Sequence, residues 1–410
     1  MIAKLKQTFP ALTERNYRYF WLGQCISVIG TWMQVTAQQW LVYSLTKSAL
    51  LLGLLGAAQF GPVMCLSLVA GVFIDRYPKK RLIIITQVGL MLQAFILALL
   101  VWSGQVTYWR VLLLATLLGF INTLDQPTRQ SFMPELVERK YLRSAIGLNS
   151  AIFNVARMTG PALAAVLMAK YGPGLLFFIN GISFIPVIIG LSLIRIKPFT
   201  RNTVQKKILQ EIREGLKYVR QSVSLRSTVL SMFAVSTFVM NFNVITPIYA
   251  AEVLKQGVSG YGFLLSATGV GSFVGAVLVA SVAKGKPKLK LLFGSAFIVS
   301  VLLMLLEPIH VLPLAAALFV LIGFFNILFM TTANSMMQFN SSDQFRGRVM
   351  SVYSFAFLGT TPLGNLFAGS IAQRLGAGFG VLVCGAISSS LIVLIVINTL
   401  AKRPARQANG

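Results

Sequence analysis

The sequence predicts an all-α membrane protein with twelve transmembrane helices. Its apolar content, its long apolar runs and the placement of its charges support this fold class. Of the 410 residues, 56% are apolar and 11% are charged, whereas soluble domains carry about 25% charged residues. A soluble protein of this size could not bury so much apolar surface. Barrel strands alternate apolar and polar residues, and runs such as 90–101 and 387–397 lack that alternation.

Twelve apolar segments predict the transmembrane helices. A helix needs about 20 residues to cross about 30 Å of hydrocarbon, and each segment meets or approaches this length. The segments cover about residues 17–43, 48–74, 82–102, 108–128, 145–169, 174–194, 228–250, 258–283, 289–306, 311–335, 349–373 and 378–400.

The cationic residues indicate the orientation in the membrane. The chain has 36 Lys and Arg residues against 10 Asp and Glu residues, a formal net charge of +26. Between the expected spans, 30 cations lie on the side that holds both termini and five on the opposite side. Loops rich in Lys and Arg stay in the cytoplasm, so we expect both termini there and a plasma-membrane location. The excess charge therefore reflects topology and does not indicate nucleic-acid binding.

The sequence lacks the residue patterns of metal and nucleotide sites. Cys25, Cys65 and Cys384 all lie in apolar runs, and the single histidine, His310, cannot form a zinc site. No GxxxxGK[ST] loop occurs. We therefore expect no metal, no cofactor, no catalytic residues and no enzymatic activity.

An internal repeat predicts two halves of six helices each. The segment 118–124 recurs as 322–328, the segment 71–80 is similar to 280–289, and Pro161 corresponds to Pro362. We expect two pseudo-symmetric six-helix bundles at 1–194 and 228–400, a cytoplasmic linker at 195–227 and a basic tail at 401–410. Apolar residues at helical spacing in 208–219 predict an amphipathic helix on the membrane surface, either as a simple connector or with a regulatory or lipid-sensing role.

Two motifs resemble those of the major facilitator superfamily. The loop that contains Gly71, Asp75, Arg76, Lys80 and Arg81 resembles its signature loop between helices 2 and 3. The resemblance implies a latch that holds the two halves together on the cytoplasmic side in the outward-facing state. The cations alone could instead fix topology or bind anionic lipid headgroups.

The second motif lies in the fifth predicted helix. Gly147, Ala156, Gly160, Pro161 and Ala164 are similar to the antiporter motif of twelve-helix drug:proton exporters, with Ala in place of three glycines. The resemblance implies a gate that favours exchange over leak. Helix packing alone is the alternative reading, because small residues four apart let helices approach closely. Further matches, such as Asp125-Gln-Pro127-Thr-Arg129, resemble the branch that includes the enterobactin exporter.

Ionisable residues inside membrane spans are costly and mark functional sites. Asp125 and Arg129 are four residues apart on one helix and share a face, which predicts an ion pair. Arg157 lies in the next span. We expect these three residues to couple transport to proton exchange, with a purely structural ion pair as the alternative.

The expected cavity is largely apolar with scattered amides and aromatic rings, as suits an amphipathic organic molecule. Helix–helix hydrogen bonding is an equally good explanation for each amide. The candidate substrate contacts are Gln34, Gln38, Asn122, Asn154, Phe238, Asn241 and Asn326.

The leading functional prediction is a secondary active transporter that exports amphipathic small molecules, such as a drug, a siderophore or another metabolite, in exchange for protons by rocker-switch alternating access. The alternatives are an importer or flippase for a lipid-like or nutrient substrate and, more distantly, a non-transporting scaffold or receptor. The expected partners are a small-molecule substrate, protons and membrane lipids, with the chain acting as a monomer.

Overall fold

The computed structural model describes residues 9–195, 208–282, 287–342 and 345–401. Every regular element in these ranges is a helix, so the all-helical prediction is confirmed there. The predicted basic tail, apart from its first residue, and much of the predicted linker lie outside the described residues. The helices group into two compact units, Met1–Thr46 with Gly61–Val204, and Lys47–Phe60 with Gln205–Gly410.

The first unit is built mainly from five long helices. α2, α6 and α7 pack against one another, and α4 lies between α7 and α5. Short 3₁₀ helices at Pro10–Thr13 and Arg139–Tyr141 precede α2 and α6. The long helices are α2 (Arg15–Thr46), α4 (Lys79–Trp102), α5 (Tyr108–Leu136), α6 (Leu142–Tyr171) and α7 (Pro173–Leu193), together with the second part of α3 (Ala49–Arg76).

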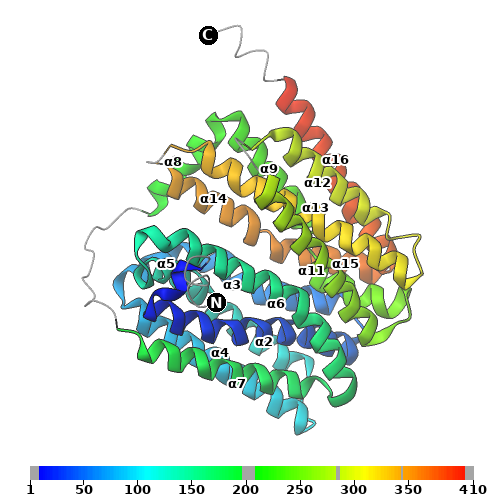
Figure 1. The fold of residues 1–410 in the computed structure, drawn as a ribbon. Coiled ribbons are helices and arrows are strands. Elements are labelled where there is room, and N and C mark those ends of the chain that lie inside the picture. Colours follow the sequence, from blue (N-terminus) through cyan, green and yellow to red (C-terminus); the bar gives the residue numbers. More distant parts are fainter. Residues whose placement is uncertain (1–8, 196–207, 283–286, 343–344, 402–410) are drawn as a thin grey trace. The chain divides into compact units, whose positions relative to one another are not determined.

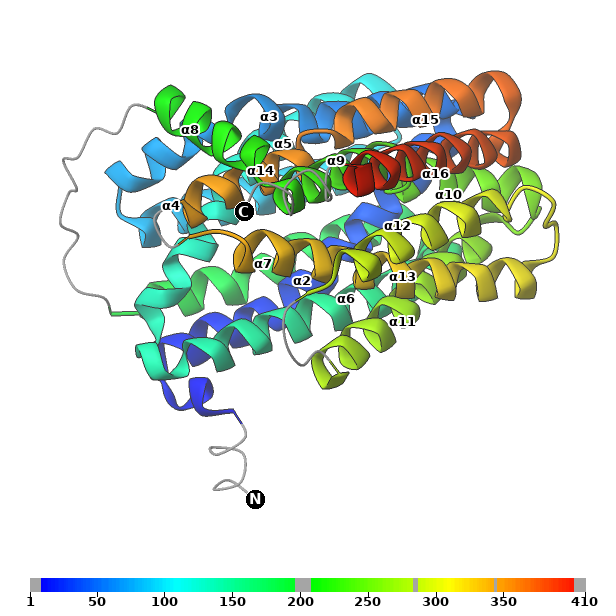
Figure 2. The ribbon, with the colours of Figure 1, turned by 90° about the horizontal axis from the view of Figure 1, so that it is seen from above.

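The second unit contains the start of α3 and the remaining helices. α16 runs beside α12 and α15, as Figure 2 shows, and α11 packs along α13. A π-helical turn at Tyr249–Val253 follows α10. The helices are α8 (Ile208–Gln221), α9 (Val223–Phe238), α10 (Phe242–Ile248), α11 (Gly257–Val282), α12 (Leu289–Met304), α13 (Leu312–Phe339), α14 (Arg346–Leu358), α15 (Thr361–Leu375) and α16 (Ala377–Ala401).

Eight helical stretches of the described residues are long and apolar enough to cross a membrane. Helices α2, α5 and α12 and the pair α14–α15 occupy the other four predicted spans. Glutamines lower the hydropathy of α2, Asp125 and Arg129 lower that of α5, and α12 has 16 residues. The eight stretches are Ala49–Leu66, Lys79–Trp102, Arg139–Tyr171, Pro173–Leu193, Val223–Val253, Gly257–Val279, Leu312–Phe339 and Ala377–Ala401.

Some helix boundaries of the first half of the sequence recur about 204 residues later. Helix α13 begins 204 residues after α5, at Leu312 and Tyr108, and α14 begins 204 residues after α6, at Arg346 and Leu142. Gly172 and Gly376 end α6 and α15 with φ of 75° and 85°, a region that favours glycine. The division into two six-helix bundles stays a prediction.

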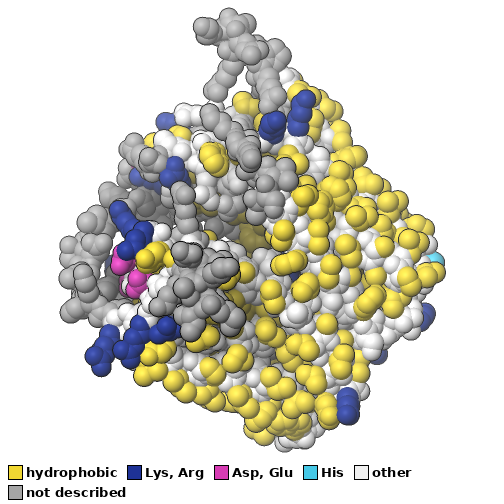
Figure 3. Space-filling model, in the orientation of Figure 1, with side chains coloured by type: hydrophobic (Ala, Val, Ile, Leu, Met, Phe, Trp, Pro, Cys, Tyr) yellow, Lys and Arg dark blue, Asp and Glu magenta, His cyan; other side chains and the backbone are white. Residues whose placement is uncertain are grey.

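Apolar side chains cover the outer faces of these helices. On α4, Ile85, Leu92 and Leu99 recur at seven-residue steps on one face and are 67%, 52% and 65% exposed. Figure 3 shows hydrophobic side chains over much of the visible flank, with Lys and Arg gathered at the edges of the view. Exposed apolar area of this extent marks a surface that contacts lipid or other apolar partners.

The amphipathic helix predicted in the linker is present as α8, and one of its faces packs on α14. The Glu214 carboxylate lies 2.6 Å from an Arg348 guanidinium nitrogen, and the Tyr218 ring stacks on Phe345 with centroids 4.6 Å apart. Gly215 lets the two helices approach, because a Cβ atom there would lie 3.0 Å from the Arg348 Cβ. The membrane-surface prediction can therefore apply only to the opposite face of α8.

Candidate functional site

The most deeply buried charge of the described residues is Asp125, whose side chain has no solvent exposure. It lies near the middle of α5 in the first unit. An isolated carboxylate in such a place is very unfavourable unless it is paired and hydrogen-bonded. Its partners come from two directions, from α4 and from the next turn of α5.

The α4 partners are two consecutive polar residues. The Thr86 hydroxyl lies 2.7 Å from Asp125 Oδ1, and Gln87 Nε2 donates to the same oxygen at 2.9 Å. Both side chains are buried, with Gln87 at 0% exposure. One carboxylate oxygen thus receives two hydrogen bonds, which stabilise its charged form.

The α5 partner is Arg129, one helical turn beyond Asp125. Its Nη2 lies 2.5 Å from Asp125 Oδ2, which confirms the ion pair expected from the four-residue spacing. Its Nη1 donates to Gln24 Oε1 on α2 at 2.8 Å. The Arg129 side chain is 26% exposed, so the pair joins a buried acid to a cation that reaches the surface of the unit.

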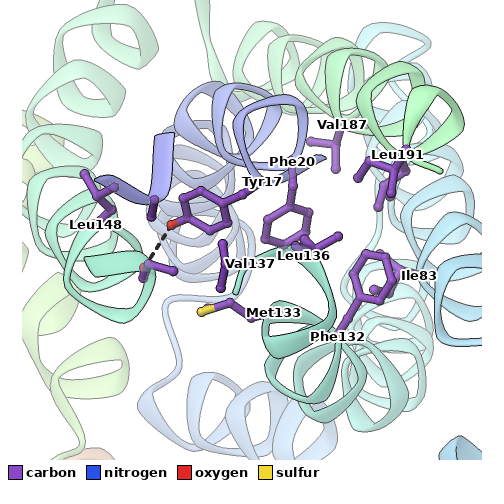
Figure 4. Close-up of a cluster of buried hydrophobic side chains, with 13 residues drawn as sticks. Tyr17, Phe20, Ile83, Phe132, Met133, Leu136, Val137, Leu148, Val187 and Leu191 are labelled. Carbon is purple, nitrogen blue, oxygen red and sulfur yellow. Dashed lines mark hydrogen bonds between the residues drawn. The ribbon is translucent and has the colours of Figure 1, made fainter. Parts of the chain in front are cut away.

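Packed apolar side chains bound this network on both sides along the helices. On one side, Phe20, Ile83 and Phe132 belong to a buried cluster that points inward between α2, α4 and α5 (Figure 4). On the other side, Leu90 and Leu118 pack with Phe184. These layers keep Asp125 in an apolar environment, where the state of its charge depends on the few polar groups that touch it.

The third predicted member of the coupling group, Arg157, lies on α6 and is partly exposed. The described hydrogen-bond and ion-pair partners of Asp125 are Thr86, Gln87 and Arg129. The structure therefore brings Asp125 and Arg129 together, and a role for Arg157 beside them stays a prediction.

The antiporter-like residues of α6 form a close contact with α2. A Cβ atom on Gly160 would lie 2.6 Å from the Trp32 Cβ. Ala156 and Ala164 are fully buried, and Pro161 is buried within the same helix. Gly147 differs, because no described neighbouring atom lies within 4 Å of its Cβ position. The motif thus packs α6 on α2 over the segment 156–164 and not at its first glycine.

The loop motif between α3 and α4 supplies two cations to helix ends. Lys79 donates to the Ser131 carbonyl and pairs with Glu135 in the last turns of α5 at 3.2 and 2.6 Å. Lys80 donates to the carbonyl oxygens of Ser192 and Ile194 at the end of α7, at 3.0 and 2.7 Å. Cations stabilise the negative ends of helix dipoles. Arg76 and Arg81 are exposed, and the surroundings of Gly71 and Asp75 lie outside what the structure describes.

Comparison with known proteins gives the family of this chain. A family model described as transmembrane secretion effector matches residues 6–409. The chain belongs to this family of the major facilitator superfamily. The superfamily prediction is confirmed, and so are those of a multi-pass transporter of the plasma membrane and of a protein that is not an enzyme.

Relatives that match most of this chain include bacterial transporters. It is 25% identical to the staphyloferrin A transporter of Staphylococcus aureus, over 88% of this chain and 90% of the relative. It is 24% identical to the multidrug efflux pump Tap of Mycolicibacterium fortuitum, over 85% and 87%. Macrolide efflux protein A of Streptococcus pyogenes is 20% identical over 93% and 96%.

Solved structures of other transporters share the fold of this chain. A bacterial homologue of the human lysosomal transporter Spinster, inward-facing and unoccupied, aligns with a TM-score of 0.71 at 15% identity, over 94% of this chain and 95% of that one. The nucleoside transporter NupG aligns with a TM-score of 0.70 at 10% identity, over 93% and 98%. These likenesses establish the fold of a membrane transporter.

Gln34, a predicted substrate contact of this transporter, hydrogen-bonds to protein groups. Its Nε2 donates to Gln93 Oε1 at 2.9 Å, and Asn180 Nδ2 donates to Gln34 Oε1 at 2.8 Å. The triad joins α2, α4 and α7 and is buried. The hydrogen bonds of Gln34 therefore join neighbouring helices, which is the alternative to substrate contact that the sequence left open for each amide.

The other predicted substrate contacts of the first unit are Gln38, Asn122 and Asn154, and their described hydrogen bonds leave room for a further partner. Gln38 is buried, and its Nε2 has no hydrogen-bond partner among the described atoms. Asn122 is partly exposed, and Asn154 donates to the Ser150 carbonyl at 2.8 Å. Their roles as substrate contacts stay predictions.

In the second unit, the predicted contacts Phe238 and Asn241 lie at a break between α9 and α10. Asn241 sits in the break, fully buried, with Nδ2 bonded to the Thr237 carbonyl and Oδ1 without a described partner. Gly364 of α15 lies against it, since its Cβ position is 2.8 Å from Asn241 Oδ1. Phe238 packs edge-on against Phe367, and Asn326 on α13 is buried with an unpartnered Oδ1. Broken helices with unsatisfied polar groups are typical of transporter binding regions.

Sequence reasoning missed Thr86, Gln87 and Gln24, the uncharged partners of the ion pair. The signal that could have found Thr86 and Gln87 is an adjacent polar pair within the apolar run of α4 that follows Arg81. Polar side chains inside a span need partners on neighbouring helices, and α5 carries the acid.

Proposed function

We propose that this transporter exports small amphipathic organic molecules in exchange for protons, with Asp125 as the site of proton binding. The observation that carries the proposal is the ion pair of a fully buried carboxylate with a partly exposed arginine. Such a pair has two alternative states, one with the carboxylate charged and paired and one with it protonated and released from the cation.

The exchange follows from the cost of a buried, unpaired charge. When Asp125 binds a proton, its attraction for Arg129 is lost and the guanidinium is free to rotate toward other acceptors. When Arg129 returns, the proton leaves. A transporter that permits each change in only one of its two facings couples the proton gradient to substrate movement.

The substrate class rests on the relatives and on the predicted cavity. The relatives are named for a siderophore, for macrolides and for multidrug efflux, which favours export of organic molecules. We assign substrate contact to Gln38, Asn122, Asn154, Phe238, Asn241 and Asn326, and a supporting cationic role to Arg157. In this proposal two six-helix bundles rock about the site, both termini are cytoplasmic, and the monomer is the working unit.

The decisive test is transport in inverted membrane vesicles with a diverse panel of compounds. We expect uptake of at least one compound that depends on an acid-inside gradient and disappears when the gradient is collapsed. Asp125→Asn should abolish this gradient-dependent uptake, because an amide cannot exchange a proton. Glu138→Gln is the matched control, since Glu138 is exposed and pairs only with Lys140 among the described residues.

Uptake that persists in Asp125→Asn and without a gradient would contradict proton antiport. An importer or flippase would move its substrate out of inverted vesicles or between leaflets, so the direction of movement separates that alternative. A scaffold or receptor would move no compound of the panel at all.

A further inference from the structure

The two α4 partners of Asp125 each have a second hydrogen-bonding capacity. Thr86 Oγ1 lies 2.7 Å from Asp125 Oδ1 and 2.8 Å from the Ile83 carbonyl oxygen. A hydroxyl group has one proton, so it can donate to one of these oxygens at a time. Gln87 uses its Nε2 on Asp125, while its Oε1 is buried without a described partner.

These additional hydrogen-bonding positions of Thr86 and Gln87 matter because the charge on Asp125 has a single described counter-ion. Among the described groups that face Asp125, the charged one is Arg129 on its own helix; Gln24 of α2 and Thr86 and Gln87 of α4 do not titrate. If Arg129 moves away, a fully buried carboxylate without a cation is unstable and takes up a proton.

A neutral carboxylic acid needs different partners from a carboxylate. It carries an O–H group that must donate, whereas the carboxylate only accepts. A buried site that binds one form well usually leaves an unsatisfied group around the other. The α4 side chains avoid this, because a hydroxyl and an amide can each donate or accept.

We propose that Thr86 and Gln87 form an adaptable cradle that binds Asp125 in both its charged and its neutral form. In the charged form both side chains donate to Oδ1, as the structure shows. In the neutral form Thr86 turns its proton to the Ile83 carbonyl and its oxygen accepts from the acid, or the Gln87 amide rotates and presents Oε1. The proton comes from water and bonds to a carboxylate oxygen of Asp125 as the Arg129 contact breaks. No other bond changes.

This inference rests on the proposed function, and it identifies Thr86 and Gln87 as positioning residues for proton exchange. They touch the proton-binding group and hold it between the apolar layers formed by Ile83 and Phe132 on one side and Leu90 and Leu118 on the other. They act on the acid and not on the transported molecule.

Infrared titration of the purified protein in lipid nanodiscs tests the cradle. The carbonyl band of protonated Asp125 is assigned by its loss in Asp125→Asn. Its amplitude against pH gives the titration midpoint, and its position reports hydrogen bonding to the neutral acid. The variants are Thr86→Val, Gln87→Met and the conservative Thr86→Ser. Thr123→Val is the matched control, because Thr123 is equally buried but bonds only to Gly119 of its own helix among the described partners.

We expect Thr86→Val to change the midpoint, because the charged form loses a donor. The band of the neutral acid should also move to higher wavenumber in whichever of Thr86→Val and Gln87→Met removes the side chain that accepts from it. Gln87→Met should change the midpoint too, and Thr86→Ser and Thr123→Val should match the native protein.

A midpoint and a band position that are unchanged in both Thr86→Val and Gln87→Met would overturn the cradle. A changed midpoint with an unchanged band position would also overturn it, because only the charged form would then be bound. Vesicle transport separates this failure from failure of the proposed function. Gradient-dependent transport with an unmoved midpoint contradicts the cradle alone, whereas a moved midpoint without gradient-dependent transport contradicts proton antiport alone.

Discussion

Gly160 on α6 faces Trp32 on α2 so closely that a Cβ atom on Gly160 would lie 2.6 Å from the Trp32 Cβ. A larger residue at this position must push the two helices apart. We expect Gly160→Leu to destabilise the folded protein by about 1–3 kcal/mol, the usual effect of overpacking. Thermal unfolding of the purified protein in detergent measures the effect.

Gly147 provides the matched control within the same motif. Its Cβ position has no described neighbour within 4 Å, and alanine is favoured over glycine inside a helix by about 0.5–1 kcal/mol. Gly147→Ala should therefore leave stability unchanged or raise it slightly. Equal destabilisation by the two substitutions would show that the motif packs along its whole length.

The Asp125–Arg129 pair gives a prediction that a surface ion pair would not. Removing the cation leaves a fully buried acid that must either stay charged without a counter-ion or take up a proton, so Arg129→Met should destabilise the protein by about 3–5 kcal/mol. The double variant Asp125→Asn/Arg129→Met should recover most of that loss, since no charge then remains in the site. A double-mutant cycle of unfolding free energies measures the coupling. Additive effects of the two substitutions would mean that the pair contributes nothing.

The ion pair was predictable from the sequence, but its surroundings were not. A spacing of four residues puts Asp125 and Arg129 on one face of any helix. Thr86 and Gln24 reach the pair only through the packing of α4 and α2 on α5, and the rotation of each helix about its axis depends on all its contacts. Gln34 illustrates the same limit, because sequence could name it as a buried amide but could not say that Gln93 and Asn180 bind it.

Helix α8 shows what periodicity can and cannot predict. The spacing of its apolar residues correctly indicates a helix with two different faces. It does not specify which face packs on α14, and in the structure that face holds Glu214, Gly215 and Tyr218. The all-helical character of the described residues was predictable because each helix depends on local composition. The break between α9 and α10 at Asn241 depends instead on contacts with distant residues such as Gly364.

Lys80 caps the end of α7, which gives a prediction for the loop motif. Its ammonium group donates to the carbonyl oxygens of Ser192 and Ile194. Lys80→Met should destabilise the protein by about 0.3–1 kcal/mol and speed hydrogen exchange in the last turn of α7. Peptide-resolved hydrogen–deuterium exchange measures this. Arg81→Gln is the control, because the Arg81 side chain is exposed, and it should leave that turn unchanged. Faster exchange in both variants would show that the loss of any nearby positive charge, and not the loss of the cap, loosens this turn.

Tyr218 on α8, outside the predicted membrane spans, gives a pH-dependent prediction. The Ser342 backbone N–H donates to its phenolic oxygen at 3.1 Å, and this lowers the pKa of Tyr218 below its usual value of 10.0. A pKa lowered by docking means that docking is strengthened as Tyr218 ionises. The added stability is therefore absent below the docked pKa, grows as pH rises through it, and is complete above the pKa of the undocked helix.

The difference in ultraviolet absorbance between the native protein and Tyr218→Phe, followed against pH, isolates the titration of this residue. We expect a midpoint below 10.0. Gly215→Leu should return the midpoint toward the usual value, because a side chain at Gly215 meets the Arg348 Cβ and backbone and pushes α8 away from α14. Phe345→Ala should leave the midpoint low, since it removes the ring contact and keeps the Ser342 donor. A midpoint unaffected by Gly215→Leu would show that the lowered pKa does not come from docking on α14.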